Sequence, residues 1–214
     1  MFDLKNKIAL VTGAGSGMGK SHAFVLAAQG AKVVVTGRDL ENCQLVADEI
    51  KAKGGKAIAL KMDVTDLAEI NKVFDEVIKQ FVRLDILVNN AGIFQPKPAL
   101  EITEEDWDKM IDIDLKGVFL CAQRAAKEMT KNKWGRIINI ASIASGGAGI
   151  GFAGGCHYTT AKGGVIGMTE TMAVEWALLG INVNAIGPGA IDTPMIAAAQ
   201  MSKEETEAML STIP

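Results

Sequence analysis

The chain has 214 residues, 49% of them hydrophobic and 22% charged, which suits a single globular domain with a core of its own. A net charge of -3, with no cluster of Lys and Arg, argues against a nucleic-acid-binding protein, and the apolar runs are too short for a membrane span. The first residues lack the apolar core of a signal peptide, and the three cysteines show no disulfide or zinc spacing, so we expect a cytoplasmic protein with reduced thiols that acts on a small molecule.

Six short runs rich in β-branched residues alternate along the chain with longer segments of helical apolar spacing. A strand followed by a helix, repeated in this way, predicts a parallel sheet, and continuously apolar runs such as 33–35 and 86–88 predict strands covered on both faces. The sequence therefore predicts an α/β fold, a doubly wound parallel sheet of the Rossmann type with helices on both faces. The expected strands are 7–12, 31–36, 57–62, 84–89, 135–140 and 181–186.

A glycine-rich loop follows the first expected strand, with the sequence TGAGSGMG at 12–19. Glycines allow the backbone to approach a pyrophosphate and to place it at the positive N-terminus of the next helix, although a plain tight turn is the alternative for such a loop taken alone. Position 18 is Met, so the loop departs from G-x-G-x-x-G and follows T-G-x-x-x-G-x-G. The residues expected to bind the phosphates of a nucleotide are Gly13, Ser16, Gly17, Met18 and Gly19.

This loop resembles that of the short-chain dehydrogenase/reductase family. The resemblance extends over essentially the whole chain, through Asp63-Val64, Asn89-Asn90-Ala91-Gly92, Tyr158-x-x-x-Lys162 and Pro188-Gly189. It implies a nicotinamide cofactor. Asp63 would then hydrogen-bond the adenine amino group, and Thr193 together with Ile191 would hold the amide of the nicotinamide. The other cofactor-binding positions that it implies are Val64, Asn90, Ala91, Gly92, Tyr158, Lys162, Pro188 and Gly189.

Asn89 and Asn90 have two interpretations. The resemblance implies that they brace the central sheet near the cofactor, whereas Asn side chains that end a strand commonly satisfy their own backbone in a turn.

The resemblance also bears on the C-terminal part of the chain. Family members usually continue into another helix and a seventh strand, so we expect the seventh strand to be absent from a single domain spanning 1–214, with 187–214 as the substrate-lid region. An incomplete sheet would expose an edge strand and apolar helix faces. A homotetramer or homodimer is the expected assembly.

The end of the second expected strand distinguishes the two nicotinamide cofactors. NAD-selective enzymes usually have a carboxylate there, but this chain has Gly37 followed by Arg38, whose guanidinium can pair with a 2′-phosphate. Asp39 could reach the ribose if the loop were offset, and its other role would be to cap a helix that begins at Leu40. The sequence therefore favours NADP(H), with NAD(H) as the alternative.

Tyr158 and Lys162 are four residues apart on an expected helix, so their side chains share one face. A tyrosine hydroxyl ionises near pH 10 unaided, and a cation about 4 Å away at an effective dielectric of 20 contributes about 4 kcal/mol, enough to make it an acid and base near neutrality. We therefore expect Tyr158 and Lys162 to form the catalytic centre. The adjacent Cys156 and His157 point in different directions on a helix, which argues against a thiol–imidazole pair.

Two further residues complete the expected centre. A serine should polarise the substrate carbonyl. The register of the fifth strand favours Ser142, while Ser145 has the separation from Tyr158 that is more familiar in the family and remains the alternative. Where the family has an asparagine, this chain has Asp114, whose carboxylate could pull on Lys162 or distort the helix.

These features predict an oxidoreductase that transfers a hydride between a nicotinamide and a carbonyl or secondary alcohol, with Tyr158 as the acid and base. The sequence as a whole is similar to those of 3-oxoacyl-[acyl-carrier-protein] reductases. An acidic carrier would require two cations beside the pocket; Lys133 fits the first position, but Leu179 occupies the second. A sugar or steroid dehydrogenase is one alternative. A nucleotide-binding protein with little or no turnover is another, motivated by Asp114 and the missing strand.

Overall fold

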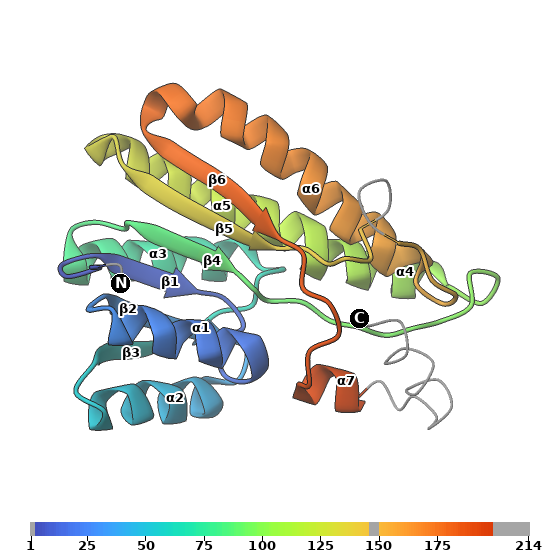
Figure 1. Cartoon of the computed structure of the whole chain (residues 1–214), viewed down its shortest axis with the longest axis horizontal. Helices are drawn as coiled ribbons and strands as arrows, with labels where there is room; N and C mark the ends of the chain where they lie inside the picture. Colours follow the sequence, from blue (N-terminus) through green and yellow to red (C-terminus); the bar gives the residue numbers. More distant parts are fainter. Residues whose placement is uncertain (1–2, 146–149, 199–214) are drawn as a thin grey trace.

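The structure of the chain is a computed structural model, and it describes residues 3–145 and 150–198. Six parallel strands form one sheet in the order β3-β2-β1-β4-β5-β6 (Figure 1). Their bounds are β1 (Ile8–Val11), β2 (Lys32–Gly37), β3 (Lys56–Lys61), β4 (Ile86–Asn89), β5 (Gly135–Ile140) and β6 (Ile181–Ile186). The predicted doubly wound parallel sheet is therefore confirmed, and every strand lies within two residues of its expected range.

Helices cover both faces of this sheet. On one face, α1 (Gly17–Ala28) and α2 (Leu40–Ala52) pack on alternate residues of β1 and β2, in a core that includes Val11 and Val35. On the other face lie α3 (Leu67–Phe81), α5 (Gly117–Met129) and α6 (Cys156–Trp176), over a core that includes Leu10 and Phe74. Because β1 and β2 are covered on both sides, their side chains are apolar without alternation.

The remaining elements are short. Helix α4 (Glu104–Ile111) begins at a capping box formed by Thr103 and Asp106, and it is followed by a π-helical turn (Asp112–Lys116) that leads into α5. Helix α7 (Pro194–Ala198) follows β6. None of the helices in the described ranges combines the length and apolarity that a membrane span needs.

Strand β6 differs from the central strands because only one of its faces is covered. Ile181 and Val183 are buried, whereas Asn182, Asn184 and Ile186 are exposed. In the part of the chain that the structure describes, β6 pairs with β5 alone and forms an edge of the sheet. The expectation of an exposed edge strand is thus met within the described residues.

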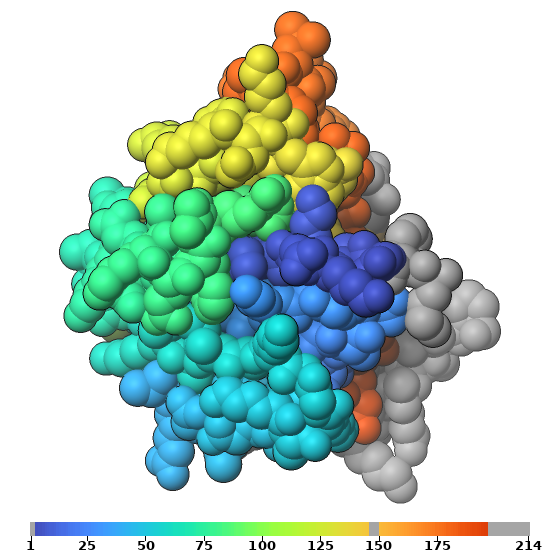
Figure 2. All heavy atoms as spheres, turned by 90° about the vertical axis from the view of Figure 1, so that its left-hand side faces the viewer, coloured from blue at the N-terminus to red at the C-terminus, as the bar shows by residue number. Residues whose placement is uncertain are grey.

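The strand order determines where a ligand can enter. The chain moves outward from β1 through β2 to β3, then returns to place β4 on the other side of β1, so the connections after β1 and β4 leave in opposite directions. Such a reversal opens a crevice at the carboxyl ends of the strands. Figure 2 shows the opposite end of the sheet, where the colours run from cyan through blue and green to yellow and orange as this order requires.

Candidate functional site

A cleft lies at the carboxyl ends of β1 to β4, where the fold predicts a ligand. Many residues expected to bind a cofactor line it, namely Gly13, Ser16, Gly17, Met18, Arg38, Asp63, Val64, Asn90, Ala91, Gly92 and Thr193. Its wall also includes Gly37, which the sequence placed at the end of the second strand, and residues that were not assigned to the cofactor, namely Met62, Ile93, Ile113, Pro194 and Met195. Met62, which directly follows β3, could have been found from its position, since ligands bind at strand ends.

The glycine loop depends on missing side chains at defined positions. Gly13 and Gly17 have φ values of 61° and 53°, a region that favours glycine. A Cβ on Gly13 would lie 2.8 Å from the Cα of Ala91. Gly19 does not line the cleft: a Cβ there would overlap the carbonyl oxygen of Gly13, so this glycine allows α1 to pack closely beneath the loop.

Thr12 joins the glycine loop to the segment after β4, a role that sequence reasoning missed. Its Oγ1 accepts hydrogen bonds from the backbone N–H groups of Asn90, at 3.0 Å, and Ala91, at 2.9 Å. In return, Nδ2 of Asn90 donates to the carbonyl oxygens of Thr12, at 3.0 Å, and Gly13, at 3.1 Å. Four hydrogen bonds therefore hold together the two loops that face each other across the crevice.

Asn89 braces the sheet from within rather than closing a local turn. Its Nδ2 donates to Oδ1 of Asn139 on β5, at 2.9 Å, and to the carbonyl oxygen of Val118 on α5, at 3.2 Å. Asn139 in turn donates to Oγ1 of Thr169 on α6, at 2.9 Å. This buried chain of amides and a hydroxyl ties two strands to two helices, so the bracing interpretation describes Asn89 better than the turn interpretation.

Arg38 and Asp39 have separate surroundings at the end of β2. Asp39 is the N-cap of α2: its carboxylate accepts hydrogen bonds from the backbone N–H of Asn42, at 3.0 Å, and from Nδ2 of Asn42, at 2.6 Å. Arg38 lines the cleft. Below the loop, burial and the nearby Asp39 carboxylate raise the pKa of the Cys43 thiol to about 11, which keeps that thiol neutral and unreactive.

Tyr158 and Lys162 lie one turn apart on α6, as predicted, with the Lys162 Nζ 5.7 Å from the centre of the Tyr158 ring. Lys162 is only 4% exposed, and its Nζ donates to the carbonyl oxygen of Ile140 at the end of β5, at 3.1 Å. The hydrogen bond holds the ammonium group at the carboxyl end of the sheet. A Cβ on Gly92 would lie 3.5 Å from this Nζ, so Lys162 sits directly behind the wall of the cleft.

Asp114 forms a buried ion pair with Lys162. The distance between Oδ2 of Asp114 and Nζ of Lys162 is 3.1 Å, and Oδ1 accepts a hydrogen bond from the backbone N–H of Ile93 at 2.8 Å. Burial raises the pKa of the Asp114 carboxyl, while the Lys162 ammonium and the Ile93 N–H oppose that rise. The pull on Lys162 that the sequence suggested is therefore present in the structure.

A π-helical turn places Asp114 at this position. Asp112–Lys116 carries a wider turn between α4 and α5, and such turns shift the side chains that follow them around the helix axis. Gly92 leaves room for the result, because a Cβ there would lie 2.8 Å from Oδ2 of Asp114. The irregular turn thus includes the residue that departs from the family pattern.

The two candidate serines face different surroundings. Ser142 directly follows the continuation of β5, where Ala141 N–H donates to Ile186 O at 2.8 Å and Ile143 N–H donates to Pro188 O at 3.1 Å. Its side chain is half-buried, and its Oγ accepts a hydrogen bond from the backbone N–H of Ala144 at 3.0 Å. Ser145 is 8% exposed and packs against α6, where a Cβ on Gly163 would lie 2.8 Å from its carbonyl oxygen.

The segment after β6 reaches back over the glycine loop. A Cβ on Gly17 would lie 3.6 Å from the side chain of Thr193, and α7 begins immediately afterwards (Figure 1). Pro188, Gly189 and Ile191 are not among the residues that line the cleft. Residues 199–214 of the expected lid lie outside the described residues.

Comparisons with known proteins agree with this arrangement. A profile of the short chain dehydrogenase family matches residues 7–204. The 3-oxoacyl-[acyl-carrier-protein] reductase FabG of Staphylococcus aureus is 43% identical over 209 residues, which cover 97% of this chain and 83% of that protein. The (2S)-[(R)-hydroxy(phenyl)methyl]succinyl-CoA dehydrogenase subunit BbsD of Thauera aromatica is 43% identical over 192 residues, which cover 90% of this chain and 76% of that protein.

A solved structure shows the same fold. The crystal structure of a protein from Sinorhizobium meliloti, provisionally assigned as a short-chain alcohol dehydrogenase, superposes with a TM-score of 0.93 and 38% sequence identity. The match covers 100% of this chain and 83% of that one.

Proposed function

The chain belongs to the short-chain dehydrogenase family, and on that premise we propose that it interconverts a carbonyl compound and a secondary alcohol, with Tyr158 as the proton donor and acceptor. The observation that most supports this role is the position of Tyr158 one turn before a buried lysine at the carboxyl end of the sheet. When bound, the nicotinamide cofactor supplies or accepts the hydride.

The cleft suits a dinucleotide. The glycine loop stands at the N-terminus of α1, where free backbone N–H groups and the helix dipole favour a phosphate. Side chains at Gly13 and Gly17 would be strained, and Gly17 leaves open the space below Thr193. We propose that these glycines with Ser16, Met18 and Thr193 hold the phosphates and the nicotinamide end, and that Asp63 and Val64 hold the adenine.

Lys162 orients the proton transfer in this proposal. Its ammonium lies 5.7 Å from the centre of the Tyr158 ring, where a positive charge supports the hydroxyl as that group gives a proton to an alkoxide or takes one from an alcohol. Ser142 donates a hydrogen bond to the substrate oxygen as negative charge develops there. We prefer Ser142 to Ser145 because the backbone pairing beyond β5 fixes its direction, whereas Ser145 is buried against α6.

NADP(H) is the cofactor that we propose, with NAD(H) as the alternative. Arg38 lines the cleft and can pair with a 2′-phosphate, while the carboxylate of Asp39 is already engaged by Asn42. An Asp39 held as a helix cap is less able to turn toward a ribose, so the charge at this end of the cleft favours the phosphorylated cofactor.

The relatives suggest carbonyl compounds attached to a thioester, since their names include a 3-oxoacyl-[acyl-carrier-protein] reductase and a dehydrogenase of a succinyl-CoA derivative. An acidic carrier would need cations beside the cleft. Lys133 precedes β5 and Leu179 precedes β6, at the end of the sheet away from the cleft, so within one chain neither lies where such a carrier would meet it. We therefore favour a small-molecule substrate.

The test of this function is a titration with NADPH and NADH followed by an assay of cofactor oxidation with a panel of ketones that includes a 3-oxoacyl thioester. We expect tighter binding of NADPH and turnover of at least one ketone. Tight cofactor binding with no turnover across the panel would instead support a nucleotide-binding protein without catalysis, as the departure at Asp114 suggests.

Asp114 is expected to restrain the acid and base function of Tyr158. Replacing Asp114 with Asn should leave the charge of Lys162 uncompensated and move the acid limb of alcohol oxidation to lower pH. The carboxylate lies 3.1 Å from the Lys162 ammonium, so its removal changes the charge beside the tyrosine, and the displacement should be measurable in the pH–rate profile. Tyr158 is the single tyrosine of the chain, so the near-ultraviolet absorbance of tyrosinate reports its ionisation directly.

Asp112 provides a matched control on the same π-helical turn. Its carboxylate is exposed and pairs with Lys116 at 3.0 Å, so Asp112→Asn removes the same charge outside the site and should leave both the rate profile and the tyrosinate titration in place. An unmoved titration in Asp114→Asn would mean that the buried carboxyl is already protonated, and the charge argument would then be wrong.

We also expect a cytoplasmic protein that assembles as a homotetramer or homodimer. Cys43 and Cys121 are buried free thiols, as in proteins of a reducing compartment, and burial raises the pKa of Cys121 to about 12. Val174 near the end of α6 and Leu178 in the 3-10 turn that follows α6 are 79% and 97% exposed, and a second copy of the chain would cover them.

A further inference from the structure

Two phenylalanine rings surround the ring of Tyr158. Phe94 meets it edge to face, with 5.1 Å between the ring centres, and Phe152 lies at 6.4 Å in a similar orientation. The two phenylalanine rings are 5.8 Å apart. This arrangement, the aromatic wall, joins a loop after β4 to the loop before α6.

The backbone holds these two loops together. Lys97 N–H donates to the carbonyl oxygen of Gly154 at 2.9 Å, and Gly154 has a φ of 80°, which lets the chain turn at this point. Gly155 makes room for Phe152, because a Cβ there would overlap the ring. In Figure 1 the chain after β4 runs beside the start of α6, as this pairing requires. The aromatic wall is therefore set by the backbone of both loops.

The wall continues into an exposed apolar surface beside Ser142. Phe152 is 38% exposed, and Ile143 and Ile150 are 47% and 56% exposed. Ile150 N–H donates to the carbonyl oxygen of Ile143 at 2.8 Å, which brings the two isoleucines together. The nearby ammonium of Lys97 is paired with the Asp106 carboxylate. Apolar groups left open to water beside a reacting tyrosine indicate a surface that a ligand covers.

From this surface we infer that the substrate carries an aryl or other bulky hydrocarbon group next to its carbonyl, and that Phe94 and Phe152 select that group. The inference rests on the proposed function and adds the substrate class. An aryl group gains edge-to-face contacts and buries apolar area against the rings, whereas a polyhydroxylated group would bury hydroxyls there without hydrogen-bond partners. Phe152, the more exposed ring, makes the larger contact.

Kinetics with acetophenone and dihydroxyacetone test this selection. We expect the wild-type kcat/KM to be about a hundredfold higher for acetophenone, and Phe152→Ala to lower that value about tenfold, mainly through KM, while leaving dihydroxyacetone within about twofold. Phe24→Ala is the matched control: this half-buried ring lies on α1 beneath Lys53, 4.5 Å from the ammonium group, and its loss should not change the ratio.

Two kinetic results and one binding result would overturn the inference. The first kinetic result is a wild-type preference for dihydroxyacetone. The second is an equal loss on both ketones in Phe152→Ala, which would mean that the ring acts through Tyr158. Binding of benzyl alcohol to the complex with NADP, measured by calorimetry against glycerol, tests the wall without turnover. If no ketone reacts, the proposed function fails. Benzyl alcohol binding that weakens about tenfold in Phe152→Ala would still support the aromatic wall. Wild-type binding that is absent, or that Phe152→Ala leaves unchanged, would refute the wall.

Discussion

Replacing Tyr158 with Phe should lower turnover of every carbonyl substrate by about a thousandfold, because the change removes the hydroxyl that we propose gives and takes the proton. The ring remains, so its packing against Phe94 and the nearby Lys162 should be retained. The measurement is kcat with a saturating ketone, read from the oxidation of the reduced cofactor. The size of the loss follows from the usual contribution of a positioned acid or base, about a hundredfold to ten-thousandfold.

The control for this substitution is cofactor affinity. None of the residues lining the cleft changes, so NADPH should bind to Tyr158→Phe within about twofold of the wild type, and the melting temperature should move little. A variant that keeps more than about a tenth of wild-type turnover would show that another group transfers the proton.

Replacing Arg38 with Ala should weaken NADPH binding by about thirtyfold to a hundredfold, while NADH binding changes by less than about threefold. Hydrogen bonds from a guanidinium to a phosphate contribute about 1.5 to 3 kcal/mol, and NADH lacks the 2′-phosphate that would accept them. Fluorescence titration with each reduced cofactor gives both constants. The ratio of the two constants cancels any general loss of folding.

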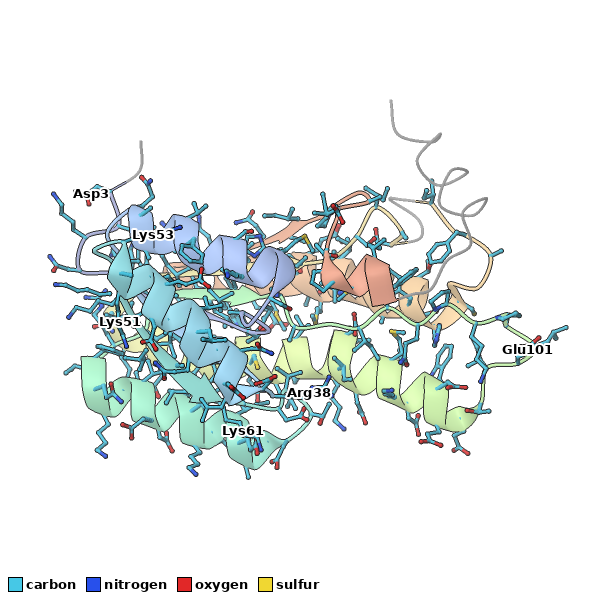
Figure 3. All side chains as sticks on the ribbon, turned by 90° about the horizontal axis from the view of Figure 1, so that it is seen from below. Asp3, Arg38, Lys51, Lys53, Lys61 and Glu101 are labelled. Atoms are coloured by element: carbon cyan, nitrogen blue, oxygen red, sulfur yellow. The ribbon has the colours of Figure 1, made fainter. Side chains whose placement is uncertain are left out.

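Lys61 supplies the matched control for Arg38. It ends β3, in register with Gly37 at the end of β2, and Figure 3 labels both cations near this edge of the molecule. Lys61 lies 3.9 Å from Glu69 and is not among the residues lining the cleft, so Lys61→Ala should leave the cofactor ratio unchanged. Equal effects of the two substitutions would point to a general field of positive charge rather than a contact of Arg38.

Local signals made much of the fold predictable. β5 and β6 occupy their predicted ranges, 135–140 and 181–186. β5 begins at Gly135 shortly after a turn at Lys133, and β6 directly follows the turn at Gly180, whose φ is 77°. The start of α2 at Leu40 follows from the capping carboxylate of Asp39. These features depend on residues close in sequence, which is why a single sequence suffices to find them.

Features that join distant segments could not be predicted in the same way. The sequence suggested that Asp114 could act on Lys162, but the π-helical turn that carries Asp114 could not be predicted, because an extra residue in one helical turn leaves no periodic trace. Gly19 was assigned to the phosphate site with its neighbours, but its missing side chain serves packing against Gly13, which only the tertiary arrangement shows. The contacts of Phe152 with Phe94 are of the same kind.

Gly92 has a consequence for how freely this protein can be redesigned. It lines the cofactor cleft on one side, while a side chain in its place would press on the carboxylate of Asp114 and approach the ammonium of Lys162 on the other. The contact that we propose between Arg38 and a 2′-phosphate could be changed separately, since Arg38 follows β2 whereas Gly92 follows β4. At Gly92 a single residue separates the cleft from the Asp114–Lys162 ion pair, so under the proposed function a substitution there would change cofactor binding and proton transfer together.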